Sequence, residues 1–147
     1  MKAQEEAIKK IKPGANFFDL YKMAAKTITA GLVKHGLLVG DLDRLVKDKA
    51  YLRFFMHGLG HCVGLDVHDP GSKEIRDGRR LLEQGMVLTV EPGIYIQPDD
   101  ETVDPKWRGI SIRIEDTILV TNNGCEILTA VAPKKIRDIE RLMREKE

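Results

Sequence analysis

The segment from His57 to Asp69 constrains the fold more than any other part of the sequence, because it combines histidines with glycines. It holds three of the four histidines of the chain. Gly58, Gly60 and Gly64 disfavour a helix there and let the backbone approach a ligand closely. Histidine is well suited to metal ligation and to proton transfer near neutral pH. The segment therefore predicts the wall of an active site; the alternative is a glycine-rich turn with histidines at a wet surface.

Helices are predicted for the first third of the chain. Residues 2–12 form a charged helical stretch that Pro13 and Gly14 would end. A short helix is expected over residues 41–49. A longer helix is expected to start near Asn16, with one apolar face made of Phe17, Leu20, Met23, Ala24, Ile28 and Leu32.

Strands are predicted after the histidine segment. Residues 69–85 are rich in glycine and charged side chains and are expected to form a surface loop. Residues 86–90 indicate a buried strand that ends at the sequence Glu91-Pro92-Gly93, where a turn is expected. A second short strand is predicted over residues 94–96.

The remaining residues predict a hairpin and a closing helix. After a polar loop at 97–108, residues 110–120 alternate as a single strand, with isoleucines on one face and Ser111, Arg113 and Glu115 on the other. Residues 122–124 favour a hairpin turn into a strand at 126–128, and a helix is expected over residues 134–147. Helices followed by strands indicate an α+β fold with a mainly antiparallel sheet.

The composition excludes several classes of partner. With 147 residues, one domain is expected. The chain has 24 basic and 23 acidic residues, and a net charge of +1 is too small to attract nucleic acid or a membrane surface. Cys62 and Cys125 lack the spacing of a disulfide framework or a zinc knuckle. No export signal or membrane span is predicted, and we expect a cytoplasmic protein.

Three side chains are candidates for metal ligation: His61, Glu91 and Glu115. Glu91 follows an apolar strand, where burial of its carboxylate would be unfavourable without a partner such as a metal ion. Glu115 lies two residues from Arg113, so both project from one face of the strand, where the guanidinium could orient the carboxylate. Each taken alone could be an ordinary solvent-facing residue, but together with the histidines they indicate a site.

Other catalytic motifs do not fit. His57 and His61 have the spacing of a helical zinc site, but the glycines oppose a helix and the glutamate of HExxH is missing. The sequence contains no GxSxG nucleophile elbow, no Walker P-loop and no GxGxxG fingerprint.

Three segments of the chain resemble the proline-specific metallopeptidases of the aminopeptidase P and prolidase group, within the methionine aminopeptidase and creatinase superfamily. These are HGLGHCVGLDVHD at 57–69, MVLTVEPGIYI at 86–96 and WRGISIRIEDTILVT at 107–121. Order and spacing agree too, so the resemblance covers nearly the whole chain from Ala3. The approach to the second glutamate strand at 107–110 is most similar to aminopeptidase P, and prolidase (an Xaa-Pro dipeptidase) is the alternative.

The resemblance implies a fold and a chemistry. Residues 1–147 would be a single partial domain, the carboxy-terminal half of a pita-bread catalytic domain. His61, Glu91 and Glu115 would bind two divalent metal ions, manganese most often and otherwise cobalt or zinc. Glu115 would bridge the ions, and Glu91 would also exchange a proton with the attacking water.

The resemblance also implies a substrate. His57 and His68 would bind a peptide with proline at its second position and stabilise the tetrahedral intermediate, while Arg113 would orient the carboxylates. The reaction would be hydrolysis of the bond between the N-terminal residue and the proline.

Two aspartates complete the ligand set in the family, in strands N-terminal to the first helix of this chain, and we expect them to be absent. Metal binding would then be weak or absent, with little peptidase activity in the chain alone. We also expect a homodimer that covers exposed apolar surface. A non-catalytic pita-bread binding module and a small regulatory partner of a full-length enzyme are alternatives; the retained histidines, glutamates and arginine favour a fragment of an enzyme.

Overall fold

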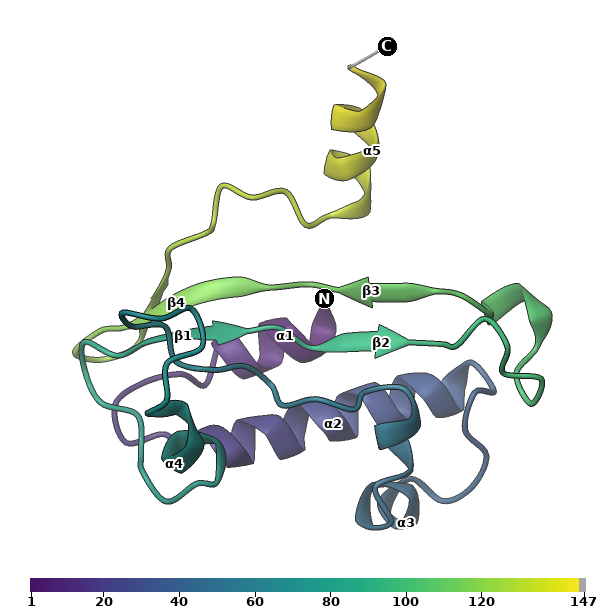
Figure 1. Ribbon diagram of the computed structural model, residues 1–147, viewed down its shortest axis with the longest axis horizontal. Helices are drawn as coiled ribbons and strands as arrows, with labels where there is room; N and C mark the ends of the chain where they lie inside the picture. The colour runs from purple at the N-terminus through teal and green to yellow at the C-terminus, as the bar shows by residue number, and fades with distance from the viewer. Residues whose placement is uncertain (146–147) are drawn as a thin grey trace.

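Helices come first, strands follow, and a helix closes the chain in the computed structural model, which describes residues 1–145 (Figure 1). The helices are α1 (Lys2–Ile8), α2 (Phe17–Lys34), α3 (Leu42–Lys47), α4 (Ser72–Arg76) and α5 (Ile136–Arg144), with 3-10 turns η1 (Ala50–Arg53) and η2 (Pro105–Trp107). The strands are β1 (Val87–Val90), β2 (Gly93–Tyr95), β3 (Ser111–Arg113), β4 (Asp116–Val120) and β5 (Cys125–Ile127). The predicted α+β class is confirmed.

The helices α1 and α2 pack against each other, and α1 also contacts β1. The helix α2 starts next to Asn16 as predicted, and the Asn16 side chain caps it by accepting from the backbone N–H of Phe18 at 3.0 Å. The predicted helix over 2–12 is too long. It ends at Ile8. Turns with backbone hydrogen bonds three residues apart follow, and they bring Ile11 into the core, where 2% of its surface is exposed.

The strands form two antiparallel ladders, β1-β4-β5 and β2-β3. The strand predicted over 110–120 is therefore two strands. Pro92 explains the break, because it accepts a bond from the N–H of Ile114 at 3.4 Å but has no N–H to return. The isoleucines of this region also differ in burial, since Ile110 is 41% and Ile112 55% exposed, whereas Ile118 in β4 is fully buried.

The same register holds on both sides of this break. Val90 pairs with Asp116 in the first ladder, and Gly93 pairs with Arg113 in the second. Glu91 and Glu115 therefore occupy opposing positions at the interruption, where side chains of an antiparallel pair share one face.

The histidine segment runs along the other edge of β1, as an extended chain and not a helix. Thr89 and Glu91 donate their backbone N–H groups to the carbonyls of His61 and Leu59, at 2.8 and 2.7 Å. Gly60 lies so close to this strand that a Cβ there would be 1.9 Å from the Thr89 carbonyl oxygen. A residue without a side chain is what permits this pairing.

Two loops contain structure that the sequence did not predict. The predicted loop over 69–85 contains α4, anchored by Ile75, which is 3% exposed. The loop over 97–108 contains η2, and Arg53 binds Asp100 and Thr102 in it. The Arg53 guanidinium lowers the pKa of Asp100 to about 2, with a smaller contribution from Thr102.

The C-terminal part begins with the predicted hairpin, closed by a bond from Thr121 N–H to the Gly124 carbonyl at 3.0 Å. The helix predicted over 134–147 is α5; residues 146–147 lie outside the described range. Figure 1 shows α5 (yellow) standing away from the strands. Its exposed apolar side chains are Ile136, Ile139, Leu142 and Met143. Among the helices within residues 1–145, none is long and apolar enough to cross a membrane.

Candidate active site

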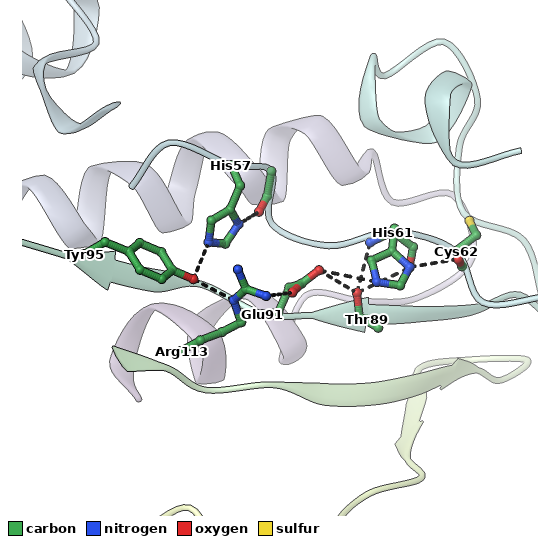
Figure 2. Close-up of polar contacts among 8 residues, drawn as sticks. His57, His61, Cys62, Thr89, Glu91, Tyr95 and Arg113 are labelled. Atoms are coloured by element: carbon green, nitrogen blue, oxygen red, sulfur yellow. Dashed lines mark hydrogen bonds and ion pairs between the residues drawn. The ribbon is translucent and has the colours of Figure 1, made fainter. Parts of the chain in front are cut away.

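A chain of hydrogen bonds holds His57 at the start of the histidine segment. Its Nδ1 lies 2.8 Å from the Gly58 carbonyl oxygen, and its Nε2 lies 3.0 Å from the Tyr95 hydroxyl. Because a carbonyl only accepts, Nδ1 carries the proton, and Nε2 of the neutral ring accepts from Tyr95. The Tyr95 oxygen accepts from Nε of Arg113 at 2.6 Å. The donors therefore run in one direction, from Arg113 through Tyr95 to His57 (Figure 2).

His61 and Glu91 face each other with almost no exposure to solvent. Nδ1 of His61 lies 3.0 Å from the Cys62 carbonyl oxygen and so carries the proton of the neutral ring. Its Nε2 lies 3.5 Å from Oε1 of Glu91, and the two side chains are 10% and 12% exposed. A neutral Nε2 and a carboxylate are both acceptors, so this approach is favourable only with a proton or a cation between them.

Glu91 has two further partners (Figure 2). The Thr89 hydroxyl donates to Oε1 at 3.3 Å, and Nη1 of Arg113 lies 3.3 Å from Oε2. The hydrogen bond with Tyr95 raises the pKa of Arg113, and the charges of Glu91 and Glu115 contribute in the same direction. Arg113 is thus held against the Glu91 carboxylate. Its predicted role in orienting the carboxylates stays a prediction.

These side chains line one cleft with a volume of about 350 Å³. His57, His61, His68, Glu91 and Arg113 all contribute to its wall. His68 is exposed, and its ring centroid lies 4.3 Å from that of His61 in an edge-on contact. Five of the six side chains predicted for the site are therefore brought together.

Glu115 is the predicted residue that stands apart. It is exposed and is not part of the cleft wall, although it occupies the position opposite Glu91. Within residues 1–145, no group of three or more His, Cys, Asp or Glu side chains is placed to hold a metal ion. The metal-ligand role of Glu115 stays a prediction.

Tyr95 is the main site residue that the sequence reasoning missed. The period of two along a strand places Glu91, Gly93 and Tyr95 on one face, so the signal was present. A Cβ at Gly93 would lie 2.6 Å from the Tyr95 hydroxyl, so glycine leaves room for that ring. Asp69 and Arg76 also line the cleft and were not singled out.

The donor set fits a divalent cation in part. A metal-binding histidine commonly donates its second ring N–H to a backbone carbonyl, as His61 does to Cys62. Glu91 offers a carboxylate oxygen 3.5 Å from Nε2 of that ring. Imidazole and carboxylate together suit manganese, zinc or cobalt, and these two residues would hold the ion.

We expect Tyr95→Phe to loosen Arg113 and His57 without unfolding the chain. The variant loses one hydrogen bond from a charged donor and one to a histidine, each with a modest net contribution. Since Arg113 is half exposed, the expected loss is about 1 kcal/mol of unfolding free energy in urea. The Nε–H of Arg113 should also exchange faster with water by NMR.

Tyr51→Phe is the matched control, because Tyr51 shares a 3.3 Å hydroxyl contact with Tyr21 and does not line the cleft. It should leave the Arg113 signal unchanged. If the Nε–H of Arg113 exchanges at the same rate in the wild type and in Tyr95→Phe, the assigned hydrogen bond from Arg113 to Tyr95 is contradicted.

Comparisons with known proteins agree with this geometry. Residues 1–122 match metallopeptidase family M24. The chain is 50% identical over 143 residues to the Xaa-Pro aminopeptidase of Haemophilus influenzae, and the matched region covers 97% of this chain and 33% of that protein. The corresponding identity to the Xaa-Pro aminopeptidase of Escherichia coli is 48%, covering 97% of this chain and 32% of that protein. The chain thus spans about a third of the length of the curated relatives it matches.

Solved structures give the same result. The chain is similar to the aminopeptidase PepP of Pseudomonas aeruginosa with a TM-score of 0.92 and 49% identity, over 98% of this chain and 33% of that one. It is also similar to zinc-substituted E. coli aminopeptidase P in complex with product, with a TM-score of 0.93 and 46% identity, over 99% of this chain and 33% of that one. The resemblance and the fold inferred from the sequence are confirmed: the chain belongs to metallopeptidase family M24.

Proposed function

We propose that this chain carries part of the active site of a dinuclear-metal peptidase that hydrolyses the bond between an N-terminal residue and proline. The observation that supports this most is the pair of acceptors, His61 Nε2 and Glu91 Oε1, held 3.5 Å apart with almost no exposure to solvent. A metal cation between them would relieve their repulsion, as a proton on Nε2 also would. The relatives named Xaa-Pro aminopeptidase support the reaction type.

In this proposal His61, Glu91 and Glu115 bind the metal ions. Divalent cations bound there would supply Lewis-acid polarisation of the scissile carbonyl. Glu115, which lies opposite Glu91, would have to turn its side chain into the cleft to bind them. Manganese is the proposed ion because carboxylate ligands suit it.

The remaining side chains act on the peptide. His57, with its proton fixed on Nδ1, and the exposed His68 would contact the substrate backbone from one wall of the cleft. Glu91 would exchange a proton with the attacking water, while Arg113 holds that carboxylate in place.

The chain alone would have a low metal affinity and little peptidase activity. It offers three of the ligands that the family resemblance implies, and only His61 and Glu91 meet in the cleft. Activity would then need further carboxylates, which we assign to polypeptide that the relatives have and this chain does not match. A cytoplasmic location is part of the same proposal.

Manganese binding tests the site directly. Titration of the chain with Mn²⁺, followed by electron paramagnetic resonance of the free ion, should detect weak binding that His61→Ala and Glu91→Gln abolish. His35→Ala is the matched control, because His35 packs against Trp107 and is outside the cleft. If His61→Ala and His35→Ala lose Mn²⁺ binding equally, the assignment of the metal site to His61 and Glu91 is contradicted.

Peptide cleavage tests the reaction. The chain alone should release almost no alanine from Ala-Pro-Ala with Mn²⁺. Addition of the unmatched part of a relative should restore release, in a manner that depends on His61. Cleavage of Ala-Pro but not Ala-Pro-Ala would indicate a dipeptidase instead. No Mn²⁺ binding and no complementation would favour a non-catalytic binding module.

A homodimer is proposed from the exposed apolar side chains of α5 and β3, among them Ile112, Ile136 and Ile139. Association of two copies through them would remove this surface from water. Light scattering at micromolar concentration should give twice the monomer mass, and a monomer would contradict the proposal.

A further inference from the structure

The outer edge of β3 is open. On the β2 side, Ile114 donates its backbone N–H to the Pro92 carbonyl at 3.4 Å. Backbone groups of successive residues point to opposite edges of a strand, so those of Ser111, Arg113 and Glu115 point away from β2. Among residues 1–145, no backbone hydrogen bond joins these groups to another segment. An edge of this kind can pair with a further extended strand.

The open edge begins where β5 stops covering β4, and it runs beside the cleft. The Thr117 carbonyl accepts from the N–H of Leu128 at 2.9 Å, and the N–H of Thr117 donates to the Thr129 hydroxyl at 3.0 Å. Residues 111–115 follow on the same edge, and Arg113 among them contributes to the cleft wall. A strand added at this edge therefore lies next to the candidate active site.

The charges along this edge are self-complementary. When two identical strands pair antiparallel with the two-fold axis at Ile114, Arg113 of each copy lies opposite Glu115 of the other. Opposite charges at facing positions stabilise a strand pair, and like charges destabilise it. An axis at Arg113 would place two guanidinium groups opposite each other, and an axis at Glu115 would do the same with two carboxylates. The axis at Ile114 compensates both charges.

The opposite face of β3 supports the same register. Ile112 and Ile114 point away from Arg113 and Glu115 because side chains alternate along a strand. With the axis at Ile114, the two copies of Ile114 lie opposite each other, and Ile112 lies diagonal to the partner's Ile114. Pairing would remove apolar surface from water, including that of Ile112, which is 55% exposed.

We propose that two copies of this chain pair edge to edge through residues 111–115, antiparallel, with the two-fold axis at Ile114. Each pair of Arg113 with the partner's Glu115 would exchange two backbone hydrogen bonds. This contact specifies, and rests on, the homodimer proposed above. Because Arg113 lies 3.3 Å from Glu91, the partner's Glu115 brings a carboxylate to the margin of the cleft. Each copy then contributes a side chain to the site of the other.

Cysteine cross-linking tests the register. The two copies of Ile114 would occupy a non-hydrogen-bonded position with their Cα atoms about 4.5 Å apart, within the range of a disulfide. Ile114→Cys should therefore give a disulfide-linked dimer on mild oxidation, with the bridge located by mass spectrometry of peptides.

Ile112→Cys is the matched control. Ile112 is on the same face of β3 and is more exposed than Ile114, so random collisions would cross-link it more readily. In the proposed register it lies opposite the partner's Asp116, so its two copies are about 13 Å apart along the strands, too far for a disulfide. Equal cross-linking of the two variants would overturn the proposal.

A charge reversal provides a second test that leaves Ile114 unchanged. Glu115→Lys places like charges at both facing positions and should weaken the dimer about tenfold, measured by sedimentation at a series of concentrations. Glu126→Lys is the control, because Glu126 is exposed on β5 and lies opposite Leu119, away from the open edge. It should leave the dissociation constant unchanged.

The outcomes separate this contact from the other proposals. A dimer that Glu115→Lys leaves unchanged would overturn the edge pairing but not the homodimer, which would then use α5. A wild-type chain that stays monomeric would overturn both, and so would one that pairs through β3 only with the unmatched part of a relative. None of these results decides metal binding by His61 and Glu91, which the Mn²⁺ titration tests separately.

Discussion

Replacing Gly60 with alanine is expected to destabilise the chain by about 3 kcal/mol or more, the upper range for overpacking in a tightly packed region. The new methyl group would lie 1.9 Å from the Thr89 carbonyl oxygen and 2.9 Å from its hydroxyl oxygen. Both atoms belong to a strand held between the histidine segment and β4, so neither can move away alone. The histidine segment would have to separate from β1, and His61 would leave Glu91.

Gly58→Ala is the matched control, two residues earlier in the same segment. A Cβ there meets its nearest neighbours, Arg76 and Gly60, at 3.8 Å, an ordinary contact. Neither glycine has a positive φ, so the two variants differ in steric room and not in backbone strain. Urea denaturation followed by circular dichroism should give Gly58→Ala a stability within about 0.5 kcal/mol of the wild type. If the two variants are equally stable, the close approach of Gly60 to Thr89 is contradicted.

Local sequence patterns predicted the helices whose own residues are enough to identify them. The apolar spacing of α2 and its start near Asn16 depend on neighbours within one or two turns, and both were confirmed. The helix α4 was missed because it has five residues and is anchored by the single buried residue Ile75. A segment this short has too few positions to display a period.

The break between β3 and β4 could not be predicted from the alternation of residues 110–120. It arises on the partner strand, where Pro92 has no N–H to complete the ladder. Which residue faces Pro92 depends on register, and register depends on tertiary packing. For the same reason the sequence could place Glu91 at the end of one strand and Glu115 in the region of another, but could not place them opposite each other.

The candidate site was predicted through residue types more than through geometry. Histidine, glutamate and arginine drew attention because they ligate metals and carry charge, and five of the six predicted side chains line one cleft. Tyr95 has no such chemical signal. Its role follows from two hydrogen bonds, to His57 and Arg113, that link segments far apart in sequence.

Replacing Lys134 with methionine is the second large effect, an expected loss of about 3 kcal/mol of unfolding free energy. Its Nζ lies 2.8 Å from Oδ1 of Asp116, a side chain that is 2% exposed. Without the lysine, the donors that remain to the buried carboxylate among residues 1–145 are neutral: Thr129, at 2.6 Å, and Gln4, at 3.1 Å. A buried charge without a counter-charge is far more destabilising than a lost surface pair.

Lys22→Met is the control for this variant, since it breaks the Lys22–Asp19 pair, in which both side chains are more than half exposed. It should change stability by about 0.5 kcal/mol or less. The double variant Asp116→Asn, Lys134→Met removes both charges and should recover part of the loss, because no charge is then left unpaired in the interior. A double variant less stable than Lys134→Met would mean that Asp116 stabilises the fold through Gln4 and Thr129 alone. If the double variant instead recovers stability, the stability lost in Lys134→Met is due to the unpaired carboxylate of Asp116, the residue that follows Glu115.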